Sequence, residues 1–116
     1  RDAPEEPPPG YAYAACPPLE TEEQQKALIG RRVLVAHNDD SGGATPIGWH
    51  VGRVRFFGVS HAHKKACPTA NFVLRYTKKE TNAEIKEGLE EPRELSAKNY
   101  GRDELWVLLD SLENPS

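Results

Sequence analysis

The chain lacks methionine and has only two cysteines, Cys16 and Cys67, among its 116 residues. Two cysteines are too few for a disulfide scaffold, so we expect free thiols in a reducing, intracellular setting. No apolar run approaches the roughly 20 residues that a membrane-spanning helix needs, and the start lacks the pattern of a signal peptide. We therefore expect no membrane partner, and because the chain begins at Arg1 we expect it to be a segment of a larger protein.

Acidic residues are absent from Ser41 to Lys79, although the whole chain has a formal net charge of −3. Residues 31–79 contain nine basic and two acidic residues, whereas residues 1–30 and 80–116 are both acidic. Such a basic block can face an anionic partner, or the acidic ends of the same chain can neutralise it.

Proline is concentrated at the start of the chain, where residues 1–19 contain six of the ten prolines. The run Pro7–Pro9 favours an extended polyproline conformation, which cannot build a packed core. We predict a disordered, acidic, Pro-rich linker over residues 1–19, a folded domain over 20–112 and a short tail over 113–116.

The pattern of the folded domain begins as a helix and then becomes β. Thr21 and Gln24 match a capping box, so a short helix is expected at about 21–29, and Gly30 suits its end. Beyond Gly30 the apolar residues alternate with a period of two between clusters of turn formers. The expected strands are 32–37, 49–59, 71–77, 93–96 and 105–109.

Five short strands predict a mainly β fold, a small five-stranded barrel with a short N-terminal helix. Within the second strand, Val54 and Phe56 are expected to pack inward while Arg53 and Arg55 face solvent. Residues 60–69 are expected to form a polar, basic loop.

Four segments resemble the strands of Tudor-like barrels. Gly30-Arg-Arg-Val-Leu-Val-Ala-His37 and Gly48-Trp-His-Val-Gly-Arg-Val54 resemble the opening strand pair of that family. Asn71-Phe-Val-Leu-Arg-Tyr-Thr77 resembles the third strand, and Trp106-Val-Leu-Leu109 resembles the last. The resemblance covers residues 29–110 and does not separate Tudor domains from Agenet domains, chromo-barrel domains or the C-terminal barrels of integrases.

The resemblance implies a site for a methylated lysine or arginine, because Tudor-like domains commonly enclose such a cation in an aromatic cage. It places the three cage positions at His37, His50 and Tyr76, of which only Tyr76 matches the family fully. Trp49 would supply a ring if the register shifted by one residue. Lys78 stands where some members of the family have an acid, and its charge would repel a cationic ligand.

The first functional hypothesis is a non-catalytic, monomeric binding module within a nuclear or chromatin-associated protein. Its partner would be a protein segment such as a histone tail, with or without methylation. The predicted peptide contacts are Trp49, His50 and Tyr76, with His37, Asp39 and Asp40 at the edge.

The alternative hypothesis is a nucleic-acid-binding barrel like those of integrases and transposases. The basic block mixes cations with Phe56, Phe57, Phe72 and Tyr76, a combination that suits phosphate neutralisation and base stacking. The predicted contacts are Arg53, Arg55, Lys64, Lys65, Arg75, Lys78 and Lys79. An ordinary solvated strand face explains the same pattern without a ligand, and a barrel that only docks inside its parent protein is a third reading.

Metal binding and catalysis have weaker support in the sequence. His61, His63 and Cys67 could contribute zinc ligands, but the chain has no C-x2-C pair to complete such a site. No nucleophile with a base, paired acids or phosphate-binding glycine loop stands out. We expect no enzyme activity, no metal and no cofactor.

Overall fold

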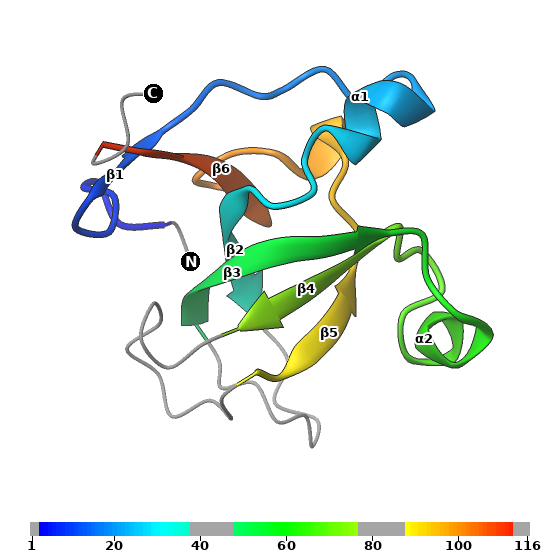
Figure 1. The fold of residues 1–116 in the computed structure, drawn as a ribbon. Helices are drawn as coiled ribbons and strands as arrows, with labels where there is room; N and C mark the ends of the chain where they lie inside the picture. The colour runs from blue at the N-terminus through cyan, green and yellow to red at the C-terminus, as the bar shows by residue number, and fades with distance from the viewer. Residues whose placement is uncertain (1–2, 38–47, 77–87, 113–116) are drawn as a thin grey trace.

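The computed structural model describes residues 3–37, 48–76 and 88–112, which form a mainly β molecule (Figure 1). Neighbouring strands run antiparallel in one sheet, in the order β1-β6-β2-β3-β4-β5. The strands are β1 (Tyr11–Tyr13), β2 (Arg32–His37), β3 (Gly48–Phe57), β4 (Phe72–Tyr76), β5 (Glu90–Arg93) and β6 (Trp106–Ser111). The helices are α1 (Glu22–Lys26), α2 (His61–Ala66) and a 3-10 helix, η1 (Ala97–Asn99).

The predicted mainly β class is confirmed, but the predicted five-stranded barrel is wrong. In the described parts of the chain, β1 and β5 are the two edges of an open sheet that has six strands. The additional strand comes from the Pro-rich leader, where Tyr11 lies opposite Ser111 and Tyr13 lies opposite Leu109 on β6. A strand added at the β6 edge extends the sheet on that side, and no β1–β5 pairing closes it.

The leader was expected to be disordered, yet its described residues are held by specific bonds. Ala3 is buried, and its amide donates to the carbonyl of Arg102 at 2.7 Å. The Arg102 guanidinium donates back to the carbonyls of Ala3 and Pro4, both at 3.1 Å. The Tyr13 hydroxyl also donates to the Pro4 carbonyl, at 2.7 Å. Polyproline backbone has no internal hydrogen bonds, so its carbonyls are free to accept these donors.

The sheet has two differently covered faces. The inner face carries the larger core, in which Trp106, Phe72 and Leu74 are fully buried and Leu28 packs from the α1 side. On the outer face a smaller cluster of Leu34, Val51, Val107 and Leu109 packs under Ala3, with the rings of Tyr11, Tyr13 and Trp49 beside it. Because β-strand side chains alternate, successive residues of β2, β3 and β6 contribute to the two faces in turn.

The short helices follow capping signals that the sequence carries. The predicted capping box of α1 is confirmed, since the Thr21 hydroxyl accepts from the Gln24 amide at 3.1 Å and the Gln24 side chain accepts from the Thr21 amide at 3.0 Å. Helix α2 lies inside the segment predicted as a loop. Its Ser60 and His63 form a capping box in which a histidine takes the place of the usual Glu or Gln.

Candidate functional site

The three residues predicted for a cage come together at one end of the sheet. His37 ends β2, Tyr76 ends β4, and His50 lies near the start of β3. The rings of His50 and Tyr76 meet edge to face with their centroids 6.3 Å apart. The Tyr76 hydroxyl donates to Glu91 Oε1 at 2.9 Å, and His37 Nδ1 lies 4.0 Å from Glu91 Oε2. Glu91 on β5 therefore joins the three into one polar cluster.

The rings of this cluster are buried rather than open. Tyr76 is 0% exposed and His50 is 4% exposed. A Cβ on Gly52 would lie 3.1 Å from the Tyr76 ring, so only glycine lets that ring lie so close against β3. Burial raises the pKa of the Tyr76 phenol well above its usual value, with a smaller contribution in the same direction from the Glu91 carboxylate. A ligand cation could meet these ring faces only after the surrounding chain moved.

The carboxylate of the cluster already has a cation from the same chain. The Arg93 guanidinium lies 3.5 Å from Glu91 Oε1 and also donates to the backbone carbonyl of Ala36. Arg93 thereby connects β5 with β2, which are not neighbours in the sheet. We refer to His37, His50, Tyr76, Glu91 and Arg93 together as the Glu91 cluster. In this arrangement it links strands, and its role as a peptide site stays a prediction.

The other predicted peptide contacts do not join this cluster. Trp49 precedes His50 on β3 and therefore points to the opposite, outer face, where it packs with the cluster that includes Leu34 and Val51. Asp39 and Asp40 lie outside the described residues.

An arginine row crosses the outer face of the sheet. Arg32 on β2 lies opposite Arg53 on β3, and Arg53 lies opposite Arg75 on β4. We call these three residues the arginine row; the next position along it, on β5, is Glu90. Directly opposed cross-strand residues have Cβ atoms only about 4.5–5.5 Å apart, and like charges on such opposed residues destabilise a sheet. Arg53 thus has an arginine on both neighbouring strands.

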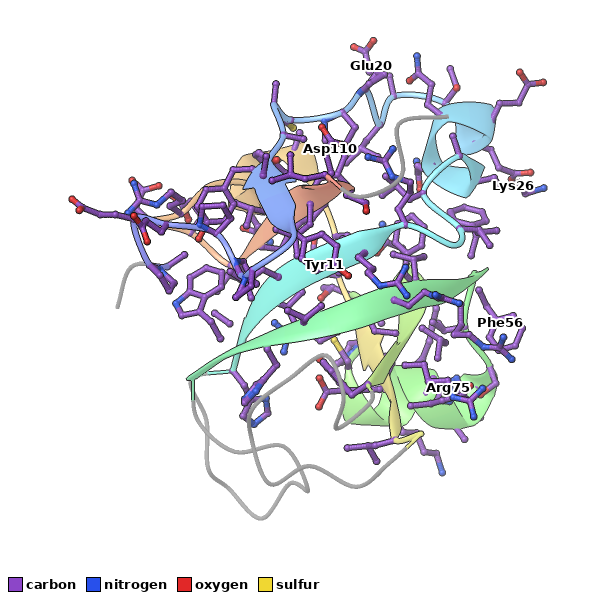
Figure 2. All side chains as sticks on the ribbon, turned by 60° about the vertical axis from the view of Figure 1, so that its left-hand side comes forward. Tyr11, Glu20, Lys26, Phe56, Arg75 and Asp110 are labelled. Atoms are coloured by element: carbon purple, nitrogen blue, oxygen red, sulfur yellow. The ribbon has the colours of Figure 1, made fainter. Side chains whose placement is uncertain are left out.

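Two guanidinium groups of the row face solvent. Arg53 and Arg75 are both exposed, and within the described residues neither takes part in an ion pair. Arg55, two residues after Arg53, is also exposed, and its Nε lies 3.6 Å from Glu90 Oε2. Figure 2 shows Arg75 on the β3–β4 side of the sheet and Tyr11 of the leader on the β1 side. The leader therefore covers one half of the outer face and the arginines occupy the other.

A β-bulge changes the direction of Phe56. Val54 lies opposite Leu74, but the next pair is Phe56 with Val73, so Arg55 is the extra residue on β3. Val73 belongs to the outer face, and Phe56 therefore points outward with 48% of its surface exposed. The prediction that Phe56 packs inward is wrong, while Val54 does pack inward and is fully buried.

Two of the lysines predicted for nucleic-acid contact do not belong to this strand face. Lys64 and Lys65 are exposed on α2, in the connection between β3 and β4 (Figure 1). Lys78 and Lys79 lie outside the described residues. The structure therefore brings together Arg53, Arg55 and Arg75 from the predicted set and adds Arg32.

His63, one of the three residues predicted as possible zinc ligands, takes part in a helix cap. His63 Nδ1 accepts the Ser60 amide at 3.4 Å in the α2 capping box. Over the described residues, no group of three or more His, Cys, Asp or Glu side chains is placed to hold a metal ion. In the same ranges no helix is long and apolar enough to cross a membrane.

Comparison of the chain with protein-family models, with curated proteins and with solved structures finds no match to any of them.

Two features of these sites, the position of Glu91 and the outward direction of Phe56, were not predicted from the sequence. Glu91 was not foreseen because the fourth strand was predicted at residues 93–96, whereas β5 covers Glu90–Arg93. The outward Phe56 had a visible signal, since Phe56 and Phe57 are adjacent and a regular strand cannot turn both rings inward. In the structure Phe57 takes the inner position and meets Phe72 edge to face, with centroids 5.4 Å apart.

Proposed function

We propose that this chain is a non-catalytic binding module whose partner is a nucleic acid, held through the arginine row. The observation that carries the proposal is the position of Arg53, which has Arg32 and Arg75 directly opposite it on the two neighbouring strands. Like charges directly opposite each other on neighbouring strands are unfavourable, and an anionic partner at Arg53 would reduce this repulsion.

A phosphate backbone suits the row better than a single anion does. One guanidinium group can bind two oxygens of the same phosphate. Each phosphate that a cation neutralises also releases counterions, and this release drives binding. Arg53 and Arg75 present exposed cations on two adjacent strands, as a polyanion requires, while Arg32 on the third strand is half-buried. An acidic peptide would satisfy the same charge and is therefore the competing partner.

The test is the salt dependence of binding to a fluorescent oligonucleotide, measured by anisotropy. Wild-type protein is compared with a double variant, Arg53→Gln with Arg75→Gln. Each phosphate contact contributes about 0.7 to the slope of log affinity against log salt for single strands and about 0.9 for duplexes. We expect the double variant to bind more weakly and to lose about 1.4 to 1.8 from that slope.

A matched control removes two positive charges elsewhere, with Lys26→Gln on α1 and Lys98→Gln on η1. Both lysines are largely exposed and each is paired with a glutamate four residues before it. This control should keep the wild-type slope. Absence of binding at low salt, an equal slope in the arginine variant, or equal affinity for polyglutamate would each overturn the proposal.

The histone-tail hypothesis is the second candidate, and one observation favours it. His37, His50 and Tyr76 do gather beside a carboxylate, that of Glu91, as a site for a cation would require. Their burial and the presence of Arg93 speak against an open cage. A fluorescent methylated histone peptide tests it: binding that excess unlabelled oligonucleotide does not displace would support a peptide site separate from the arginine row, and no binding of the peptide would contradict the hypothesis. A histone-tail partner would imply a nuclear, chromatin-associated setting.

A further inference from the structure

Phe56 stands on the outer face because of the β-bulge, beside the arginine row. The bulge makes Phe56 pair with Val73, which lies two residues from Arg75 on β4 and on the same face as the pair of Arg53 with Arg75. Bulges redirect side chains, and they are frequent next to functional sites. The ring is 48% exposed in a described surface that otherwise exposes few large apolar side chains.

The surroundings hold Phe56 without covering it. The Arg55 guanidinium carbon lies 5.1 Å from the centroid of the Phe56 ring, and Arg55 Nε lies 3.6 Å from Glu90 Oε2. Val73, which lies opposite Phe56 on β4, is buried. One face of the aromatic ring thus lies against the Arg55 guanidinium, while about half of the residue's surface stays open to solvent.

We propose that Phe56 is a stacking platform for an unpaired base, so that the arginine face binds single-stranded nucleic acid. This inference rests on the proposed function. Bases in a duplex are already stacked on each other, whereas a single strand can place a base on an aromatic ring while arginines contact its phosphates. The two helices that begin and end within the described chain, α1 and α2, have five and six residues and are too short to read a major groove.

The combination of charge and ring favours nucleic acid over an acidic peptide. Acidic side chains would use the arginines but would gain nothing from a flat apolar ring. A base has a π-face whatever its identity, so we expect weak sequence preference together with a clear preference for single strands.

The test compares one sequence as a single-stranded and as a duplex oligonucleotide, with wild-type protein and the Phe56→Ala variant. Loss of base stacking costs about 1.4 kcal/mol or more, so Phe56→Ala should bind the single strand about tenfold more weakly. Duplex affinity should stay within about twofold of the wild-type value. Phe56→Tyr keeps the ring and should restore single-strand binding, whereas Phe56→Leu keeps only the apolar character and should not.

The outcomes separate this inference from the proposed function. If the arginine double variant loses binding but Phe56→Ala binds the single strand as wild type does, the stacking inference is wrong and the arginine face stands. Equal loss for single strand and duplex would also overturn stacking on an unpaired base. If wild-type protein binds neither oligonucleotide at low salt, both proposals fail. Because Phe56 is half exposed, its variants should unfold at the wild-type temperature within a few degrees, and that measurement accompanies the assay.

Discussion

Tyr76 has a side chain suited to a cation-binding cage, yet in this structure it stabilises the fold. Its ring lies against Gly52, and its hydroxyl donates to Glu91, which also lies near His37 and Arg93. Hydrogen bonds to charged groups are worth about 1.5–3 kcal/mol, and a buried polar group that loses its partner is costly. The Glu91 cluster thus has a structural role that does not depend on any ligand.

The substitution Tyr76→Phe removes only the hydroxyl, so it tests that structural role. We expect the free energy of unfolding to fall by about 1–2 kcal/mol at neutral pH, measured by urea denaturation. Because burial raises the pKa of folded Tyr76 above the usual value of 10.0, the wild type loses stability as pH rises from about 10 toward the folded pKa. The variant should lack this part of the alkaline decline. Equal stability of the two proteins at neutral pH would show that the Glu91 bond contributes nothing.

Among the elements, those with strong alternation were predictable and those set by long-range pairing were not. The predicted strand at 32–37 matches β2, and the capping box at Thr21 marks α1 correctly. The edge strand β5 lies three residues earlier than predicted because its position depends on pairing with β4, which no local pattern in a proline-containing, charged segment specifies. Helix α2 was missed because its capping box uses His63, and no apolar face marks so short a helix.

The amino-acid composition of the leader did not indicate that part of it forms strand β1. Its prolines predicted disorder, but the alternating Tyr11 and Tyr13 fit the outer face, and Arg102 binds the carbonyls of Ala3 and Pro4. The residues that hold the leader are therefore almost one hundred positions away in sequence, which a local reading cannot detect.

The substitution Arg102→Ala should release the leader without unfolding the rest of the sheet. It removes two hydrogen bonds and the contact in which the guanidinium carbon lies 5.9 Å from the Tyr13 ring centroid. We expect faster amide hydrogen exchange at Ala3 and Tyr13, while the amides of β2 and β3 keep wild-type protection. Unchanged exchange at Ala3 and Tyr13 would mean that Arg102 does not anchor the leader.

At the scale of the whole molecule, charge and apolar surface divide the outer face of the sheet. The leader covers the β6 side with Tyr11 and Tyr13, and the arginine row occupies the β3–β4 side together with Phe56. The sequence predicted a basic block, but only the register shows that Arg53 has arginines on both sides. The position of Arg53 between two arginines, more than the number of cations, favours an anionic partner.

The substitution Arg53→Glu tests the central claim most directly, because it should change stability and binding in opposite directions. Glutamate would face Arg32 and Arg75, and each opposite-charge pair contributes roughly 0.2–1 kcal/mol, so the free energy of unfolding should rise by about 0.5–1 kcal/mol. Affinity for a single-stranded oligonucleotide should fall at least about tenfold, whereas Arg53→Lys should keep the wild-type stability and salt slope and lose only part of the affinity, because lysine keeps the charge but not the bidentate contact. A protein that becomes more stable and binds the oligonucleotide less would support the arginine row as a nucleic-acid site. Unchanged affinity in the Arg53→Glu variant would contradict it.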